Sequence, residues 1–212
     1  INDLMHKELP NMTYTCETVV QLAKDENVVK DMKRGGCTGT YVGIESGNNE
    51  MLKSIKKTQT TDECIQAMRN LQKHGIDSHA FIMVGFPNET EKTFKQTMDF
   101  IPTLRPDNVI FSVFTPYPGS DLFYQCQKDG IINGEFDLSI YNHQSPLNCF
   151  TKNISRKRFY ELRKEADQFV DRYNEKAKFR RGIAALRNIG IKATFKKVYS
   201  HYYSKVVARI NA

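Results

Sequence analysis

Three apolar, strand-like runs along the chain each end in a short cluster of polar residues and turn formers. These runs cover residues 41–47, 81–90 and 111–119. A helical pattern with apolar residues on one face follows each of them, so strands and helices alternate. This alternation predicts a parallel sheet, whose strands all end at one edge, where binding and catalytic residues collect.

Further elements are indicated by capping residues and by composition. Residues 12–17 are rich in Thr and Tyr, which predicts a first strand. A helix of about ten residues is expected from Asp25. Thr60 and Glu63 have the spacing of a capping box for another helix. A last helix is expected to begin after Ser155 and to run to about Ala177.

The expected fold is α/β. About four β/α units form the C-terminal portion of a partial parallel β/α barrel, and C-terminal helices follow. A closed eight-stranded barrel takes about 250 residues, and an open sheet of four strands leaves a long unpaired edge, which native proteins avoid. We therefore expect missing upstream strands, and the start at Ile1 reads as a cut inside a longer chain. The expected parts are residues 1–135 (barrel half), 136–177 (loop and helix) and 178–212 (basic amphipathic tail).

The net charge of +7 is unevenly distributed along the chain, and beyond Glu175 the sequence has Lys and Arg residues but no Asp or Glu. Apolar and aromatic residues are interleaved with these cations. Such a tail suits an anionic membrane surface. It equally suits a nucleic acid such as tRNA, to which binding would fall steeply with salt. A solvated helix on the flank of the barrel is the third interpretation that stays open.

The cysteines do not form a recognisable zinc or redox motif. Their wide separation and odd number also argue against a complete disulfide framework, so we expect no metal site and a reduced cytoplasmic setting, with membrane association possible only through the tail. A run of about 18 apolar residues, as a membrane span requires, is absent from the sequence. The five cysteines are Cys16, Cys37, Cys64, Cys126 and Cys149.

Glu45 is the first candidate binding residue, because it lies where an apolar strand ends. A carboxylate accepts hydrogen bonds from two vicinal hydroxyls, as a ribose offers them, and each such charge-assisted bond contributes about 1.5–3 kcal/mol. Ser46 adds a small donor and acceptor, and Gly47 allows a ligand to approach the backbone. The alternative is that Glu45 only faces the N-terminus of the next helix and its dipole.

The other two strand ends carry further candidates. At the end of the 81–90 run, Gly85 permits a turn and Pro87 fixes φ, so a flat ledge for an adenine ring competes with an ordinary strand-to-helix turn. After the 111–119 run, Tyr117 lies in a segment stiffened by two prolines and either walls a pocket or lies in a plain turn. His143, in the loop that follows, is a candidate substrate contact or proton donor, or an idle exposed side chain.

Taken in order, these motifs resemble the later strands of radical S-adenosylmethionine (SAM) enzymes. The nearest class is the one with an upstream cobalamin-binding domain, which includes anaerobic cyclases and carbon methylases. The resemblance extends over about residues 10–175. The matching stretches are residues 15–18, 36–47, 83–90 and 115–119, the loop 141–143 and the helix from Ser155.

The resemblance implies a partial six-stranded β/α barrel and a 4Fe-4S cluster that reduces SAM to methionine and a 5′-deoxyadenosyl radical. By position, Glu45 and Ser46 would hold the ribose and methionine ends of SAM. Gly85 and Pro87 would border the adenine. The next strand would place two residues beside it, Phe114 and Thr115.

The chain departs from the family pattern at two points. It lacks the Cys-x3-Cys-x2-Cys loop that holds the cluster, and Val19 stands where relatives often place Arg. We therefore expect the C-terminal part of such an enzyme, whose cluster ligands lie in a missing N-terminal part and which alone makes no radical. The substrate is expected to be a small or lipid-like molecule, and methyl transfer, cyclisation and cobalamin use stay open. A non-catalytic module that binds SAM or serves only as a scaffold, and a tRNA-modifying radical SAM enzyme, are the alternatives.

Overall fold

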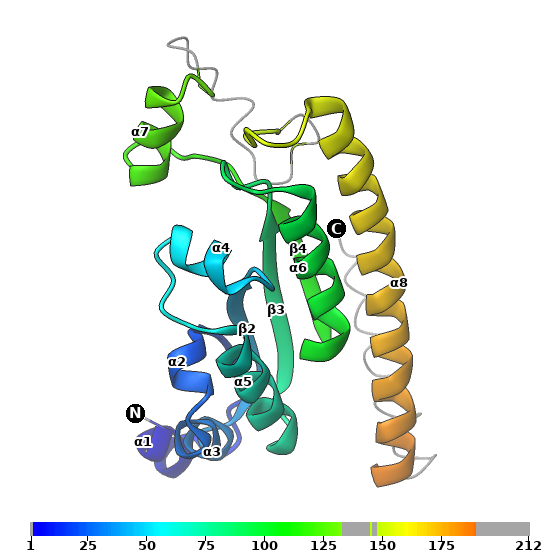
Figure 1. Ribbon diagram of the computed structural model, residues 1–212. Coiled ribbons are helices and arrows are strands. Elements are labelled where there is room, and N and C mark those ends of the chain that lie inside the picture. Colours follow the sequence, from blue (N-terminus) through cyan, green and yellow to red (C-terminus); the bar gives the residue numbers. More distant parts are fainter. Residues whose placement is uncertain (1, 133–144, 146–147, 190–212) are drawn as a thin grey trace, which may run out of the picture.

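A computed structural model describes residues 2–132, 145 and 148–189 of the 212-residue chain. Four strands alternate with helices, and a long helix closes the described part (Figure 1). The strands are β1 (Tyr14–Thr18), β2 (Cys37–Glu45), β3 (Asp77–Val84) and β4 (Asn108–Val113). The helices are α1 (Asn2–Glu8), α2 (Val20–Ala23), α3 (Glu26–Arg34), α4 (Asn49–Ser54), α5 (Thr61–Lys73), α6 (Glu91–Leu104), α7 (Asp121–Lys128) and α8 (Arg156–Ile189).

The four strands form one parallel sheet in the order β1-β2-β3-β4. Each strand is joined to its neighbour through at least one helix, as the alternating pattern predicted. The register between β2 and β3 is irregular between Gly43 and Glu45, and Glu45 has a φ of 66°. A positive φ is uncommon outside glycine and requires support from the surrounding structure. The end of β2 is therefore a locally strained part of the sheet.

The sheet has one covered face and one open face. Alternate side chains such as Val42, Ile44, Ala80 and Ile82 are buried against α3, α5 and α6. Figure 1 shows α5 and α6 on the same side of the strands. Side chains of the opposite face, such as Phe81, are only partly buried. Within the described residues, the helices therefore cover one face of the sheet.

The capping residues fix most helix starts where the sequence predicted them. The Asp25 side chain caps α3, and Thr60 and Glu63 form the predicted capping box of α5. α6 continues through Pro102 to Leu104. Because Pro102 lies in the last turn of α6, its missing N–H costs only one hydrogen bond near the helix end.

α8 is longer than predicted and lies along the edge of the sheet. The expected end near Ala177 was wrong, since the helix continues to Ile189 through residues with high helix propensity. Asn174 of α8 accepts a hydrogen bond from Val109 N (2.8 Å) and donates one to Val109 O (2.9 Å). These two bonds satisfy part of the outer edge of β4. The helices in the described part of the chain include none with the length and hydropathy needed to span a bilayer.

Candidate functional site

Glu45 lies at the carboxyl end of β2 and lines a hollow on the open face of the sheet. Its carboxylate Oε1 is 2.9 Å from Lys57 Nζ, and the Glu45 side chain is 15% exposed. Gly43 makes room for this pair, because a Cβ atom there would lie 2.9 Å from Glu45 Oε1. The carboxylate is therefore accessible from the hollow and already paired with a cation.

The Glu45 pocket has a volume of about 490 Å³, which is in the size range of small-molecule sites. Tyr41 and Phe81 supply aromatic surface, with ring centroids 5.7 Å apart. Gln59 closes one side, and its Nε2 donates to Gly43 O at 3.0 Å. The complete lining is Glu17, Thr18, Val19, Val20, Gln21, Tyr41, Gly43, Glu45, Lys56, Lys57, Thr58, Gln59 and Phe81.

Ser46 and Gly47 follow Glu45 but pack against α6. The Ser46 side chain is fully buried, and its hydroxyl lies 3.0 Å from Thr97 Oγ1. Gly47 N donates to the same Thr97 oxygen at 3.2 Å. A Cβ at Gly47 would lie 2.5 Å from Phe100 Cβ, so close helix packing alone requires this glycine. Their predicted contacts with a ligand stay predictions, and both residues have a clear role in joining β2 to α6.

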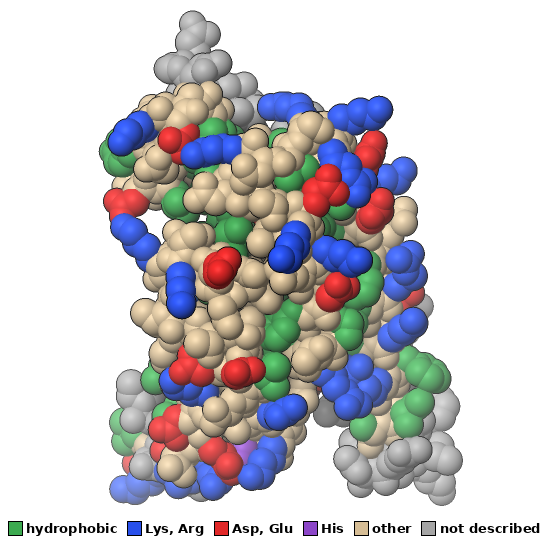
Figure 2. Space-filling model, viewed as in Figure 1, with side chains coloured by type: hydrophobic (Ala, Val, Ile, Leu, Met, Phe, Trp, Pro, Cys, Tyr) green, Lys and Arg blue, Asp and Glu red, His purple; other side chains and the backbone are tan. Residues whose placement is uncertain are grey.

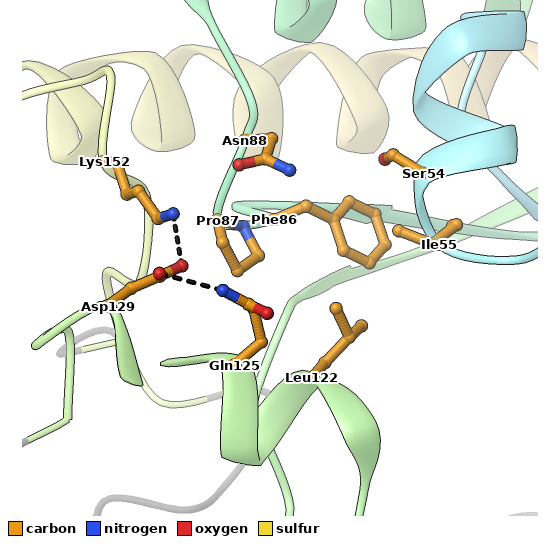
Figure 3. A pocket seen from close by; sticks show the side chains of 9 residues that line it. All are labelled: Ser54, Ile55, Phe86, Pro87, Asn88, Leu122, Gln125, Asp129 and Lys152. Carbon is orange, nitrogen blue, oxygen red and sulfur yellow. Dashed lines mark hydrogen bonds and ion pairs between the residues drawn. The ribbon is translucent and has the colours of Figure 1, made fainter. Parts of the chain in front are cut away.

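The turn after β3 contains Gly85 and Pro87. Gly85 has a φ of 87°, and a Cβ there would lie 2.9 Å from Phe159 Cζ and 3.2 Å from Val113 Cγ1. Pro87 lines a second hollow, of about 80 Å³, between α4, this turn and α7. In Figure 3 Phe86 and Pro87 lie side by side there, while Lys152 and Gln125 both reach Asp129.

Glu89 closes the same turn from the inside. Its side chain is fully buried, and Oε2 accepts a hydrogen bond from Gly85 N. Oε1 has no hydrogen-bond partner among the described residues. Burial raises the pKa of the Glu89 carboxyl to about 7, against the opposing effect of backbone hydrogen bonds.

The residues predicted on the fourth strand end lie in an aromatic core. Phe114 is buried, with its ring centroid 5.2 Å from that of Phe86. Thr115 is also buried, and its Oγ1 accepts from Asn148 Nδ2 at 2.7 Å. Tyr117 is 49% exposed. His143 lies outside the described residues, so its predicted role stays a prediction.

The segment that contains β1–β3 and the Glu45 pocket is similar in sequence to a known protein superfamily. Residues 3–101 match the radical SAM superfamily. The matched segment is slightly less than half of the chain and is similar to this superfamily. An uncharacterised methyltransferase from Pyrococcus horikoshii is 37% identical over 47% of this chain and 22% of its own length. The bacteriochlorophyllide d C-12(1)-methyltransferase from Chlorobaculum tepidum is 35% identical over 49% of this chain and 23% of its own length.

Solved structures agree with the radical SAM fold. Coproporphyrinogen III oxidase from Escherichia coli, described as a radical SAM enzyme, superposes with a TM-score of 0.57 and 15% identity over 81% of this chain and 36% of that one. This similarity confirms the predicted partial β/α barrel. Other sequence matches are named as an anaerobic magnesium-protoporphyrin IX monomethyl ester cyclase and as a tRNA methylthiotransferase. The aligned segments cover less than a quarter of the two methyltransferases.

The residues present suit the two groups of radical SAM chemistry unequally. A carboxylate beside aromatic rings in a hollow of about 490 Å³ fits a nucleoside. Among the described residues, no three His, Cys, Asp or Glu side chains are grouped to hold a metal. Burial raises the pKa of the Cys37 and Cys64 thiols to about 12, which disfavours the thiolates that iron requires. The described part therefore fits SAM and does not fit the cluster.

The strand ends lie at one edge of the sheet, as the sequence predicted. The prediction did not show that the candidate residues at these ends line separate hollows. Glu45, Gly47 and Pro87 line three different hollows. Lys57 was missed, although a lysine twelve positions after a strand-end glutamate is a visible, if weak, signal. The burial of Glu89 had no sequence signal, because an acidic residue before a helix usually faces solvent.

Proposed function

We propose that the chain is the SAM-binding portion of a radical SAM enzyme and that Glu45 holds the ribose of the cofactor. The observation that carries this proposal is the Glu45 carboxylate in a pocket at the carboxyl end of β2, within the superfamily segment. A strained backbone supports it, since residues held at unusual φ cluster at functional sites.

In the proposed complex, the ribose hydroxyls replace Lys57 as donors to Glu45. The ion pair is 2.9 Å long and the Lys57 side chain is 41% exposed, so Lys57 can move into solvent at small cost. Tyr41 and Phe81 then cover part of the nucleoside and exclude water. Beside a 4Fe-4S cluster held by residues outside the described part, bound SAM would be the source of a 5′-deoxyadenosyl radical. The chain's own residues orient the nucleoside for that chemistry.

The free edge of β1 is the proposed attachment point for the remaining strands of the barrel. β1 is the first strand of the sheet, so its outer edge pairs with no described strand. Apolar side chains on the segments that flank β1 in sequence are exposed, by 51% for Leu9, 54% for Val19 and 51% for Leu22. An N-terminal part of the same protein that adds strands here would cover these side chains and bring the cluster ligands.

The reaction class follows from the relatives and is proposed only at that level. Methyltransferases and a cyclase are among the matches, which favours methyl transfer or ring closure on a small or lipid-like molecule. Cobalamin use is proposed because a cobalamin-dependent radical SAM enzyme superposes over 97% of this chain with a TM-score of 0.56. A cytoplasmic setting stays part of this proposal.

A second candidate is a tRNA-modifying enzyme, favoured by the basic end of α8 and by a tRNA methylthiotransferase among the matches. Figure 2 shows Lys and Arg side chains of α8 on the viewed surface. Lys176 and Lys178 are exposed, and Phe179 beside them is 72% exposed. Co-sedimentation with tRNA at low and high salt tests this candidate. Binding to anionic vesicles instead would favour the membrane surface, and binding to neither would leave a solvated helix.

Equilibrium dialysis with radiolabelled SAM tests the main proposal. Glu45→Gln should weaken binding at least about tenfold, because it loses a charge-assisted hydrogen bond. Glu50→Gln, on the first turn of α4, is the control and should bind as the wild type does. A wild type that does not bind SAM favours the non-catalytic scaffold. Equal binding by Glu45→Gln would remove Glu45 from the site.

A further inference from the structure

Glu89 is a buried carboxyl group whose role the ribose site leaves unexplained. It lies between the end of β3 and the start of α6, and its side chain has no exposed surface. One carboxylate oxygen accepts from Gly85 N, whereas the other has no partner in the part of the chain that the structure describes. Burial of a carboxylate that is only partly hydrogen-bonded is costly, so the position requires an explanation.

The carboxylate closes a tight turn over residues 85–88. Glu89 N donates to Phe86 O at 2.9 Å, and Lys152 N donates to Pro87 O at 2.9 Å. Asn153 Nδ2 donates to Asn88 O at 3.1 Å. These bonds hold residues 86–88 through the backbone of the turn and through the segment that precedes α8. The Gly85 end, at a φ of 87°, is held from inside by Glu89.

Charged groups on the elements packed around the turn are engaged elsewhere. On α6 Glu91 pairs with Arg158 of α8, at 3.0 Å between Oε2 and Nε. Lys152, on the segment before α8, pairs with Asp129. The hydrogen bonds that favour ionised Glu89 come from the backbone of Gly85 and Phe86. Proton uptake by Glu89 is therefore governed by burial and by the turn itself.

We propose that Glu89 is a positioning residue for the proposed SAM site. Its ionised carboxylate holds the turn 85–88 in place, and its protonation loosens this turn. The ionised oxygen is the stronger acceptor for Gly85 N–H, because hydrogen bonds to charged groups are shorter and stronger. The protonated group keeps a weaker acceptor and gains an O–H donor that needs its own partner. Since the pKa of this carboxyl is raised to about 7, both forms are populated near neutral pH.

The consequence for ligand binding rests on the proposed function. Pro87 lies in the turn and is the predicted border of the adenine ring. A turn held by ionised Glu89 presents this border in one position, so less ordering is needed on binding. The SAM affinity of the wild type should then be about tenfold lower at pH 6 than at pH 8. This difference is counted after subtracting any pH effect on SAM affinity that Glu89→Gln also shows.

Amide NMR of the chain tests the turn directly. The Gly85 N–H resonance should titrate with a midpoint near the Glu89 pKa of about 7 in the wild type. It should stay constant in Glu89→Gln, which keeps an acceptor oxygen but carries no charge. Glu91→Gln removes the neighbouring carboxylate and should leave the titration unchanged. A flat Gly85 resonance in the wild type, or a titration that persists in Glu89→Gln, would overturn the proposal.

SAM dialysis at pH 6 and pH 8 separates this proposal from the proposed function. If the ratio of the SAM affinities of wild type and Glu89→Gln changes between pH 6 and pH 8, Glu89 is supported as a positioning residue for the SAM site. A constant ratio, with measurable SAM binding, contradicts that role. Failure of both proteins to bind SAM at either pH contradicts the SAM site instead, and the Gly85 titration still decides whether Glu89 controls the turn.

Discussion

Glu45 and Glu89 follow neighbouring strands of one sheet, yet their surroundings are opposite. Glu45 lies on the open face, is 15% exposed and pairs with Lys57. Glu89 lies inside the turn after β3, has no exposed surface and accepts from backbone N–H. One carboxylate has a partner that solvent can replace, and the other has partners that belong to the fold.

This difference separates a binding group from a positioning group. An ion pair with an exposed lysine costs little to break, so Glu45 is available for a ligand with hydroxyl donors. Glu89 has no comparable freedom, because moving it would leave Gly85 N–H unpaired inside the protein. Carboxylates at the same edge of a sheet thus serve different purposes according to what surrounds them.

The largest effect is expected for Gly85→Ala, which disturbs the turn that Glu89 holds. A Cβ atom at a φ of 87° is strained, and it would lie 2.9 Å from Phe159 Cζ. We expect the free energy of unfolding to fall by about 3 kcal/mol, from backbone strain and overpacking together. Urea denaturation measures this loss.

Gly119→Ala is the matched control for that substitution. Gly119 has a φ of 86° but nothing within 4 Å of an added Cβ. Only the backbone term remains, so we expect a loss of about 1 kcal/mol. Equal losses at the two positions would mean that the contact with Phe159 does not restrain the turn.

The pH dependence of stability should carry the signature of Glu89. Its pKa is raised from 4.5 to about 7 in the folded state, so between these values the folded protein binds more protons than the unfolded chain. This contribution to stability is fully present below pH 4.5 and is lost as the pH rises through 7, amounting to about 3 kcal/mol. Glu89→Gln should flatten this part of the profile in urea denaturation. A wild-type profile that rises over this range would contradict a buried, proton-linked Glu89.

The smallest stability change is expected on the Glu45 side. Lys57→Met removes a partly exposed ion pair and should change the free energy of unfolding by less than about 1 kcal/mol. Lys56→Met is the matched control, since Lys56 pairs with Asp121 where both side chains are largely exposed. A loss above about 2 kcal/mol for Lys57→Met alone would show that the pair is structural, and Glu45 would then not be free for a ligand.

The arrangement of strands and helices was predictable because it depends on local signals. Apolar runs and the Thr60 capping box fixed β2, β3 and α5 within a few residues. Contacts between distant side chains were not predictable. The burial of Ser46 depends on Thr97, which is 51 residues away, and the closed turn at Glu89 depends on Asn153. The end of α8 was missed, although apolar residues such as Phe179 and Ile183 continue the helical spacing beyond Ala177.

The central claim, that Glu45 holds the ribose, is tested most directly by a double-mutant cycle between protein and ligand. SAM affinity is measured for wild type and Glu45→Gln, each with SAM and with its 2′,3′-dideoxy analogue. If the carboxylate accepts from the ribose hydroxyls, removing the hydroxyls should weaken wild-type binding at least about tenfold and leave Glu45→Gln nearly unchanged. An equal loss for both proteins would show that the two groups do not interact, and the claim would be wrong.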